Sequence, residues 1–237
     1  MAAALEHLLT TTLTSLPSDL QEVIGLVGKV HLHPEGVPLS VHIVPRVTTD
    51  PENLLANGRL LHRGTSEAEL AALGVQAHEP ETAYVLMRGE TAPLSANPRM
   101  TFLHELGHYL DHVFYSLSSP YASASYTYPL VVVLAANNSR LITDRKDELS
   151  VFISDAQNDD AKKSKYKAQI ETDHHNKELF ACAYAQWVAT RSQDAKTLEE
   201  LNRLRQNKQW MDRRYWDDDD FEPIGKQFDE LKSAMGL

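Results

Sequence analysis

The motif H-E-x-x-H, within residues 101–112 (TFLHELGHYLDH), constrains this chain more than any other part of its sequence. The segment around it, residues 95–120, carries the signals of one long helix. Asn97 is suited to the N-cap, Pro98 to the first helical position, and Pro120 follows the end. We therefore predict a well-bounded helix that carries the whole motif.

The spacing within this helix separates polar from apolar side chains. With His104 placed at zero and about 100° per residue, His108 lies at about 40°, Asp111 at about −20° and Glu105 at about 100°. The leucines and other apolar residues fall on the opposite side. Imidazoles at i and i+4 can converge on one metal ion, and Glu105 is placed to activate a water molecule at that ion. The sequence therefore predicts a metal site with a general base beside it.

A glycine inside the motif adds a second constraint. Gly107 costs this helix about 1 kcal/mol relative to alanine. We interpret it as a sign that another backbone approaches the helix closely at this position.

Two histidines leave a catalytic metal site incomplete, because such sites use three protein ligands and one open position. His112 lies about 12 Å along the helix from the first histidine and cannot reach the same ion. Glu178 is the best candidate, at the start of a predicted helix over residues 176–190 whose side chains are mostly apolar or small. A carboxylate there is costly unless a cation neutralises it. The alternative is that Glu178 only favours the dipole of the helix N-terminus.

The sequences FLHELGHYLD and ELFACAYA resemble the zincin metallopeptidases of the anthrax toxin lethal factor type, including the related proline-specific endopeptidases. In that group H-E-x-G-H-x-x-D is followed by a helix bearing E-x-F-A-E-A. The resemblance covers roughly residues 80–190. It implies that His104, His108 and Glu178 bind one Zn²⁺, that Glu105 is the general base, and that Asp111 supports a ligand histidine.

The chain departs from the pattern of this group at two places. Cys182 stands where the group has a second glutamate, so a thiol is expected beside the ligands. Glu171 stands where the group usually has a tyrosine that stabilises the oxyanion, which leaves Tyr166, His174 and His175 as nearby substitutes.

The remaining sequence predicts an α+β fold with a small mixed sheet and a mainly helical remainder. Two short helices are expected within 1–30, the second over 17–30. Further helices are expected over 65–74, 140–167 and 197–206 with a short one at the end, and strands over 37–46 and 82–89. We interpret Thr197 as the start of a capping box and Asp217 to Asp220 as a solvated turn. Residues 82–89 are expected to form an edge strand over the metal helix, where an extended substrate could pair.

Domain organisation and function follow from these expectations. We predict a single zincin-like domain over 1–237, with an N-terminal helical part (1–30), a catalytic core (31–191) and a C-terminal helical extension (192–237). The predicted activity is zinc-dependent hydrolysis of peptide bonds in a peptide or protein substrate. The alternatives are a regulatory zinc protease of the repressor-cleaving type and a catalytically weak zincin scaffold that acts as a binding module.

Composition limits the partners and the compartment. A net charge of −10 gives no general attraction to nucleic acid or anionic lipid, and no apolar stretch is long enough to span a bilayer. Cys182 is the single cysteine, so no internal disulfide is available. Residues 1–17 lack the basic start of a signal peptide. We therefore expect a cytoplasmic protein, or one exported without a cleavable signal.

Overall fold

The computed structural model describes residues 16–30, 38–49, 56–76, 79, 81–89, 97–115, 176–206 and 215–234. Six helices and three strands lie in these ranges. In chain order they are α2 (Ser18–Val30), β1 (Leu39–Val44), β2 (Gly58–Leu61), α3 (Glu67–Ala72), β3 (Ala83–Arg88), α4 (Pro98–Tyr115), α7 (Asn176–Ser192), α8 (Ala195–Gln206) and α9 (Asp218–Ala234). The described part of the chain is therefore of mixed α and β structure, as the sequence predicts.

The strands form one mixed sheet in the order β1-β3-β2. β1 pairs with β3 in parallel, with Val41 opposite Val85, and β2 pairs with β3 in antiparallel orientation, with Leu60 also opposite Val85. β3 therefore lies in the centre of the sheet, and five of its six residues are buried. Among the described strands, β1 and β2 form the two edges.

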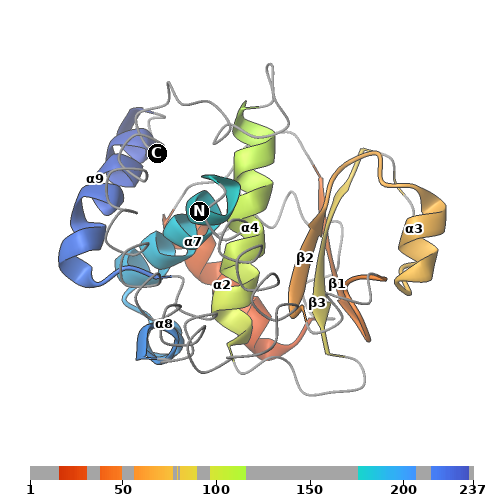
Figure 1. The fold of residues 1–237 in the computed structure, drawn as a ribbon, viewed down its shortest axis with the longest axis horizontal. Coiled ribbons are helices and arrows are strands. Elements are labelled where there is room, and N and C mark those ends of the chain that lie inside the picture. Colours follow the sequence, from red (N-terminus) through yellow and green to blue (C-terminus); the bar gives the residue numbers. More distant parts are fainter. Residues whose placement is uncertain are drawn as a thin grey trace, which may run out of the picture.

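The two faces of the sheet are covered unequally. Among the described helices, α3 is the only one on one side of the sheet in Figure 1, whereas α2, α4, α7, α8 and α9 lie on the other. The side chains of Val41 and Val85 point to the larger core, which joins the sheet to the helices on that side. Tyr84 and Leu86 point to a smaller core beneath α3. This alternation along β3 follows from the two-residue period of a strand.

α7 is the central helix of the larger layer. All residues from Leu179 to Ala189 are buried, and the helix packs against α2, α4, α8 and α9. On its inner face Gln186 pairs with the backbone of Trp216, donating to its carbonyl at 2.9 Å and accepting from its N–H at 3.0 Å. These contacts hold the segment before α9 against α7 and fix the helix whose first turn contains Glu178.

A buried arginine ties the start of α4 to its neighbours. Arg99 is 1% exposed and forms ion pairs with Asp19 and Glu22 of α2 and, at 3.0 Å, with Asp194 between α7 and α8. Because three carboxylates surround one guanidinium, the charge is compensated within the structure. The N-terminus of α4, the helix that carries the H-E-x-x-H motif, is thus anchored to α2 and to the segment between α7 and α8.

Three expectations about the sheet and the C-terminal region are wrong. Residues 82–89 do not form an edge strand, since β3 is central, and β2 is a strand that the sequence did not reveal. The aspartates Asp218 to Asp220 form the first turn of α9, a helix of 17 residues, rather than a solvated turn before a short helix. Acidic side chains are favourable there because they face the positive end of the helix dipole.

The capping prediction for the preceding helix is also wrong. α8 begins at Ala195, so Thr197 lies inside its first turn and is buried. Asp194 supplies the cap instead, accepting from the Thr197 N–H at 2.9 Å. The acceptor is a short side chain just before the helix, which is the usual chemistry of an N-cap.

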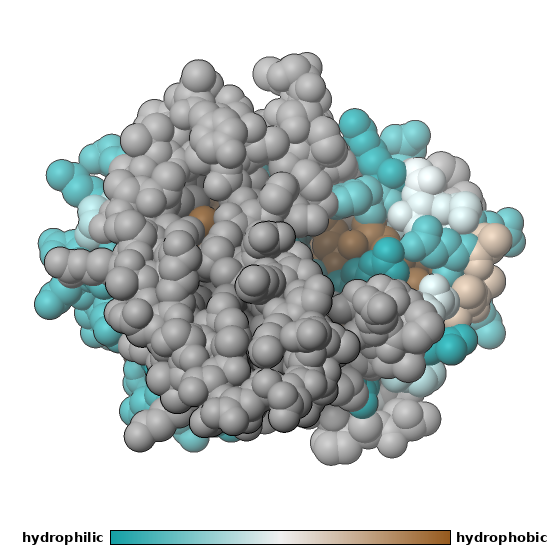
Figure 2. Space-filling view, viewed as in Figure 1, coloured by the Kyte–Doolittle hydropathy of each residue, from teal (hydrophilic) through white to brown (hydrophobic). Residues whose placement is uncertain are grey.

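The described residues that are visible on one face of the molecule are mostly polar. Hydrophilic residues dominate both sides of the view in Figure 2, and strong hydrophobic colour is confined to small regions, the largest of them beside the sheet. None of the described helices has the length and apolar character needed to cross a membrane.

Candidate metal centre

His104 and His108 lie one turn apart on α4, with their side chains 12% and 11% exposed. Their rings meet edge to face, with centroids 4.6 Å apart, and the two Nε2 atoms are separated by 3.1 Å. The helical spacing therefore brings one nitrogen of each imidazole to a common point, as the sequence predicts.

Glu178, in the first turn of α7, brings a carboxylate to the same point. Its Oε2 lies 3.3 Å from His104 Nε2, and its Oε1 lies 3.5 Å from His108 Nε2. Two ligand atoms each bound at 2.0–2.1 Å to a tetrahedral ion lie about 3.3–3.4 Å apart. The nitrogen–nitrogen separation and the two nitrogen–oxygen separations, which involve different oxygens of Glu178, lie within 0.2 Å of that range. The three groups could hold a metal ion between them. Two imidazoles and one carboxylate are a donor set that a zinc ion accepts.

The crossing of α4 and α7 makes this convergence possible. A Cβ atom built on Gly107 would lie 2.6 Å from the Cα and 2.9 Å from the carbonyl oxygen of Ala181. No side chain fits in that space, so the two backbones can pack this closely only at a glycine. The predicted close approach of another backbone at Gly107 is confirmed, and it sets the distance between the histidines and Glu178.

Comparison of the chain with known protein families, curated proteins and solved structures gave no match. The assignment of the site therefore depends on its own geometry and chemistry.

The charged groups of the cluster stabilise one another against the cost of burial. Burial by itself would raise the pKa of Glu178, but its contacts with His104 and His108 outweigh burial and hold that pKa well below its usual value. Burial opposes charge on His104, but Cys182 and Glu178 raise the pKa of this imidazole well above its ordinary range. An imidazolium or a metal ion can satisfy the same demand.

Cys182 lies next to the first histidine. The residue is 3% exposed, and its Sγ is 3.6 Å from His104 Nδ1. This is the ring nitrogen that faces away from Glu178. A partner at Nδ1 fixes the orientation of the imidazole and leaves Nε2 for a metal ion. The thiol therefore faces the site, as the sequence suggested, at a position from which it can orient His104 without being a ligand.

Asp111 is fully buried on α4, one turn after His108. The Nδ1 atom of His108 is also buried and has no hydrogen-bond partner among the described residues. The predicted support of a ligand histidine by Asp111 is therefore not visible as a hydrogen bond to this nitrogen, and it stays a prediction.

Glu105 lies beside the cluster with 6% of its surface exposed. The side chain packs against β2, where a Cβ atom built on Gly58 would lie 2.9 Å from Glu105 Oε1. The sequence did not indicate a role for Gly58, because Asn57-Gly58 is a typical turn dipeptide and predicts a turn where β2 begins. The strand edge and the candidate base are therefore direct neighbours.

The residues suggested as oxyanion stabilisers, Tyr166, His174 and His175, lie outside the described residues, as does Glu171. The side chain of His112 is likewise outside the part that the structure describes.

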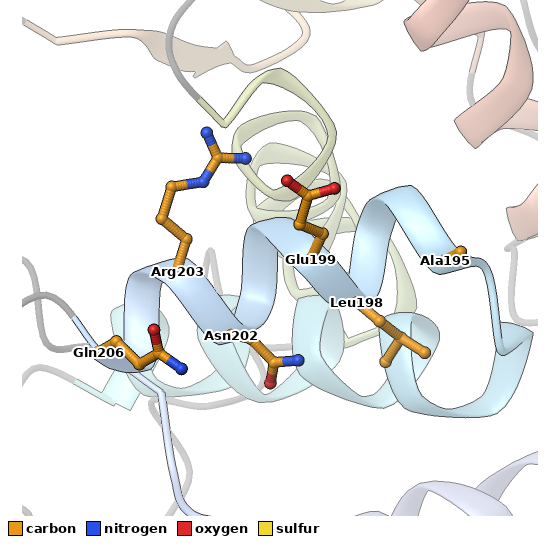
Figure 3. A pocket seen from close by; sticks show the side chains of 6 residues that line it. All are labelled: Ala195, Leu198, Glu199, Asn202, Arg203 and Gln206. Atoms are coloured by element: carbon orange, nitrogen blue, oxygen red, sulfur yellow. The ribbon is translucent and has the colours of Figure 1, made fainter.

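A recess elsewhere on the molecule does not bear on this site. It lies on the outer side of α8, as Figure 3 shows. All of its lining residues belong to that one helix: Ala195, Leu198, Glu199, Asn202, Arg203 and Gln206. None of the predicted site residues is among them, and a shallow region beside a single helix offers no converging chemical groups.

Proposed function

We propose that this protein is a zincin-like, zinc-dependent metalloendopeptidase that hydrolyses peptide bonds in a peptide or protein substrate. The observation that carries the proposal is the arrangement of His104, His108 and Glu178. Two imidazole nitrogens and a carboxylate from two crossing helices converge within 3.1–3.5 Å of one another, which supports a metal site with these three ligands. Glu105 follows the first of these donors and lies on the side of α4 that faces β2.

The chemistry can be divided between the ion and the protein. A bound Zn²⁺ would supply Lewis-acid chemistry, lowering the pKa of water and polarising a carbonyl group. His104, His108 and Glu178 would hold the ion. Glu105 accepts the proton of the attacking water at its carboxylate and then donates it to the nitrogen of the leaving amine. Cys182 holds the ring of His104 in the orientation that presents Nε2.

The edge of β2 offers a place for an extended peptide. The Arg88 N–H donates to the Asn57 carbonyl at 3.0 Å, so Asn57 and Arg88 are a hydrogen-bonded pair of the antiparallel ladder. Hydrogen-bonded and non-hydrogen-bonded pairs alternate along such a ladder, so Gly58 and Leu60 belong to non-hydrogen-bonded pairs. Their backbone N–H and C=O groups therefore face away from β3. No described strand lies on that side. A substrate strand would therefore pair along β2, next to Glu105, rather than along β3 as the sequence suggested.

The test of this function is the variant Glu105→Gln. Its amide keeps the size of the carboxylate but cannot accept the proton. We expect it to bind one zinc ion per chain as wild type does and to cleave a peptide library at least about 100-fold more slowly. Normal zinc binding together with wild-type cleavage would show that the mechanism is wrong.

A second candidate function is a binding module built on a zincin-like scaffold with little turnover. The observation that favours it is the thiol at His104 Nδ1, because a sulfur at 3.6 Å is a weaker hydrogen-bond partner than a carboxylate. A protein that binds zinc and a peptide but cleaves no member of the library would support this candidate over the enzyme. Cleavage confined to one repressor-like protein substrate would instead indicate the regulatory protease.

A further inference from the structure

Gly58 is the first residue of β2 and lies directly over the side of α4 that carries Glu105. A Cβ atom built on it would meet three atoms at less than 3.0 Å: Thr101 Cγ2 at 2.8 Å, and Glu105 Cγ and Oε1 at 2.9 Å each. Two of the three belong to the candidate base. The Cα atom of Gly58 therefore packs directly against the Glu105 side chain, and the lack of a Cβ atom leaves room for the carboxylate.

This contact differs from the one at Gly107. At Gly107 the obstacle is the backbone of Ala181, which cannot move without separating two helices. At Gly58 the obstacles are side chains, and Glu105 can respond by rotating about its own bonds. A methyl group at position 58 would thus act mainly on the position of one carboxylate.

We propose that Gly58 is a positioning residue for Glu105. The lack of a side chain at this point lets the carboxylate lie against β2, beside the backbone groups of Gly58 that face away from β3. Any larger residue moves the carboxylate off this position and leaves the three metal-binding side chains in place. The proposal deepens the proposed function and rests on the assignment of Glu105 as the general base.

Gly58→Ala is the variant that tests this, with Gly25→Ala as its matched control. Gly25 lies in α2, where a built Cβ atom meets nothing within 4 Å. We expect Gly58→Ala to bind zinc within about 2-fold of wild type and to lose on the order of 100-fold in kcat, the typical contribution of a general base. Gly25→Ala is expected to match wild type in both.

The double variant Gly58→Ala/Thr101→Ser separates positioning from a general packing defect. Serine lacks the Cγ2 atom of Thr101, so it removes the nearest of the three contacts, which is the one among them that does not involve Glu105. We expect the double variant to regain the unfolding temperature of wild type and to remain as slow as Gly58→Ala. Recovery of kcat along with stability would overturn the proposal, as would wild-type kcat in Gly58→Ala itself.

If wild type cleaves no peptide, that result counts against the proposed function but does not test the role of Gly58. A binding measurement then tests that role. Acetohydroxamic acid binds a metal ion through its oxygens and donates a hydrogen bond to a neighbouring carboxylate. Its affinity for cobalt-loaded protein can be read from the absorption spectrum. We expect both Gly58→Ala and Glu105→Gln to bind it at least about 10-fold more weakly than wild type. Equal affinity in wild type and Gly58→Ala would refute the positioning role, whatever the outcome of the cleavage assay.

Discussion

The packing of α4 on α7 at Gly107 leads to a quantitative prediction for Gly107→Ala. The new methyl carbon would lie 2.6 Å from Ala181 Cα, whereas ordinary contacts begin at 3.4 Å. The helices must therefore separate by about 1 Å to restore ordinary van der Waals contact. The distances from the histidine nitrogens to the Glu178 oxygens, now 3.3 and 3.5 Å, would grow by a similar amount. Zinc sites tolerate departures of only about 0.2 Å in each ligand bond.

The same substitution changes stability in two opposing ways. Replacing a helical glycine by alanine favours α4 by about 1 kcal/mol, and overpacking costs about 1–3 kcal/mol. The net effect lies between no change and a loss of about 2 kcal/mol, which lowers the unfolding temperature by at most about 8 °C in a chain of this size. We expect zinc affinity to fall much further, on the order of 100-fold or more, because one ligand moves out of reach.

Chelator competition for zinc and thermal unfolding together measure the two effects. Gly25→Ala, which adds a methyl group in open space, is expected to keep its zinc affinity and to gain up to about 1 kcal/mol. Adding Ala181→Gly to Gly107→Ala should restore little of the lost zinc affinity, since the obstructing atoms belong to the backbone of residue 181. If Gly107→Ala binds zinc as tightly as wild type and unfolds at the same temperature or above, the helix crossing does not set the site.

Three further predictions concern the surroundings of the site and the stability of the fold. Cys182→Ala removes the partner of His104 Nδ1, and we expect zinc affinity to fall about 10-fold to 100-fold in a competition assay; an unchanged affinity would show that the thiol does not orient the ring. Gln193 has a φ of 55° after α7, so Gln193→Gly should raise the free energy of unfolding in urea by about 0.5–1 kcal/mol, and a decrease would contradict this. Burial raises the pKa of Glu200 from 4.5 to about 7, although its carboxylate accepts from the Met100 N–H. The folded state then binds this proton more tightly than the unfolded chain does. Proton binding at Glu200 therefore contributes up to about 3 kcal/mol to the free energy of unfolding below about pH 4.5, and this contribution is lost as the pH rises through about 7. The free energy of unfolding of Glu200→Gln should lack this pH-dependent contribution when it is measured across the same pH range. An identical pH dependence in wild type and Glu200→Gln would show that the pKa of Glu200 is not raised.

The local parts of the structure were predictable because their signals are local. The helix of the H-E-x-x-H motif begins at Pro98 as its capping residues indicate, and the period-2 pattern of residues 37–46 predicts β1. Gly107 also carried information about tertiary structure, since a costly residue inside a helix indicates a neighbour that requires it. Glu178 could be ranked first because a carboxylate on a buried helix needs a counter-charge.

The remaining features depend on contacts between distant segments. β2 has only four residues, GRLL, with no β-branched residue and no alternation, so it is a strand because β3 lies beside it. The central position of β3 follows from strand order, which its own sequence does not encode. Asp194 outcompetes Thr197 as a cap partly because it also pairs with the buried Arg99. The packing of Gly58 on Glu105 joins a short edge strand to a helix more than 40 residues away and is visible only in three dimensions.

The measurement that tests the central claim most directly is the zinc content of protein purified without chelator. Wild type should be compared with Glu178→Ala and with Glu199→Ala, which removes an exposed carboxylate on α8 as a control. We predict one zinc ion per chain in wild type and in Glu199→Ala, and a large loss in Glu178→Ala at equal helix content. Unchanged zinc in Glu178→Ala, or no zinc in wild type, would contradict a metal centre formed by His104, His108 and Glu178.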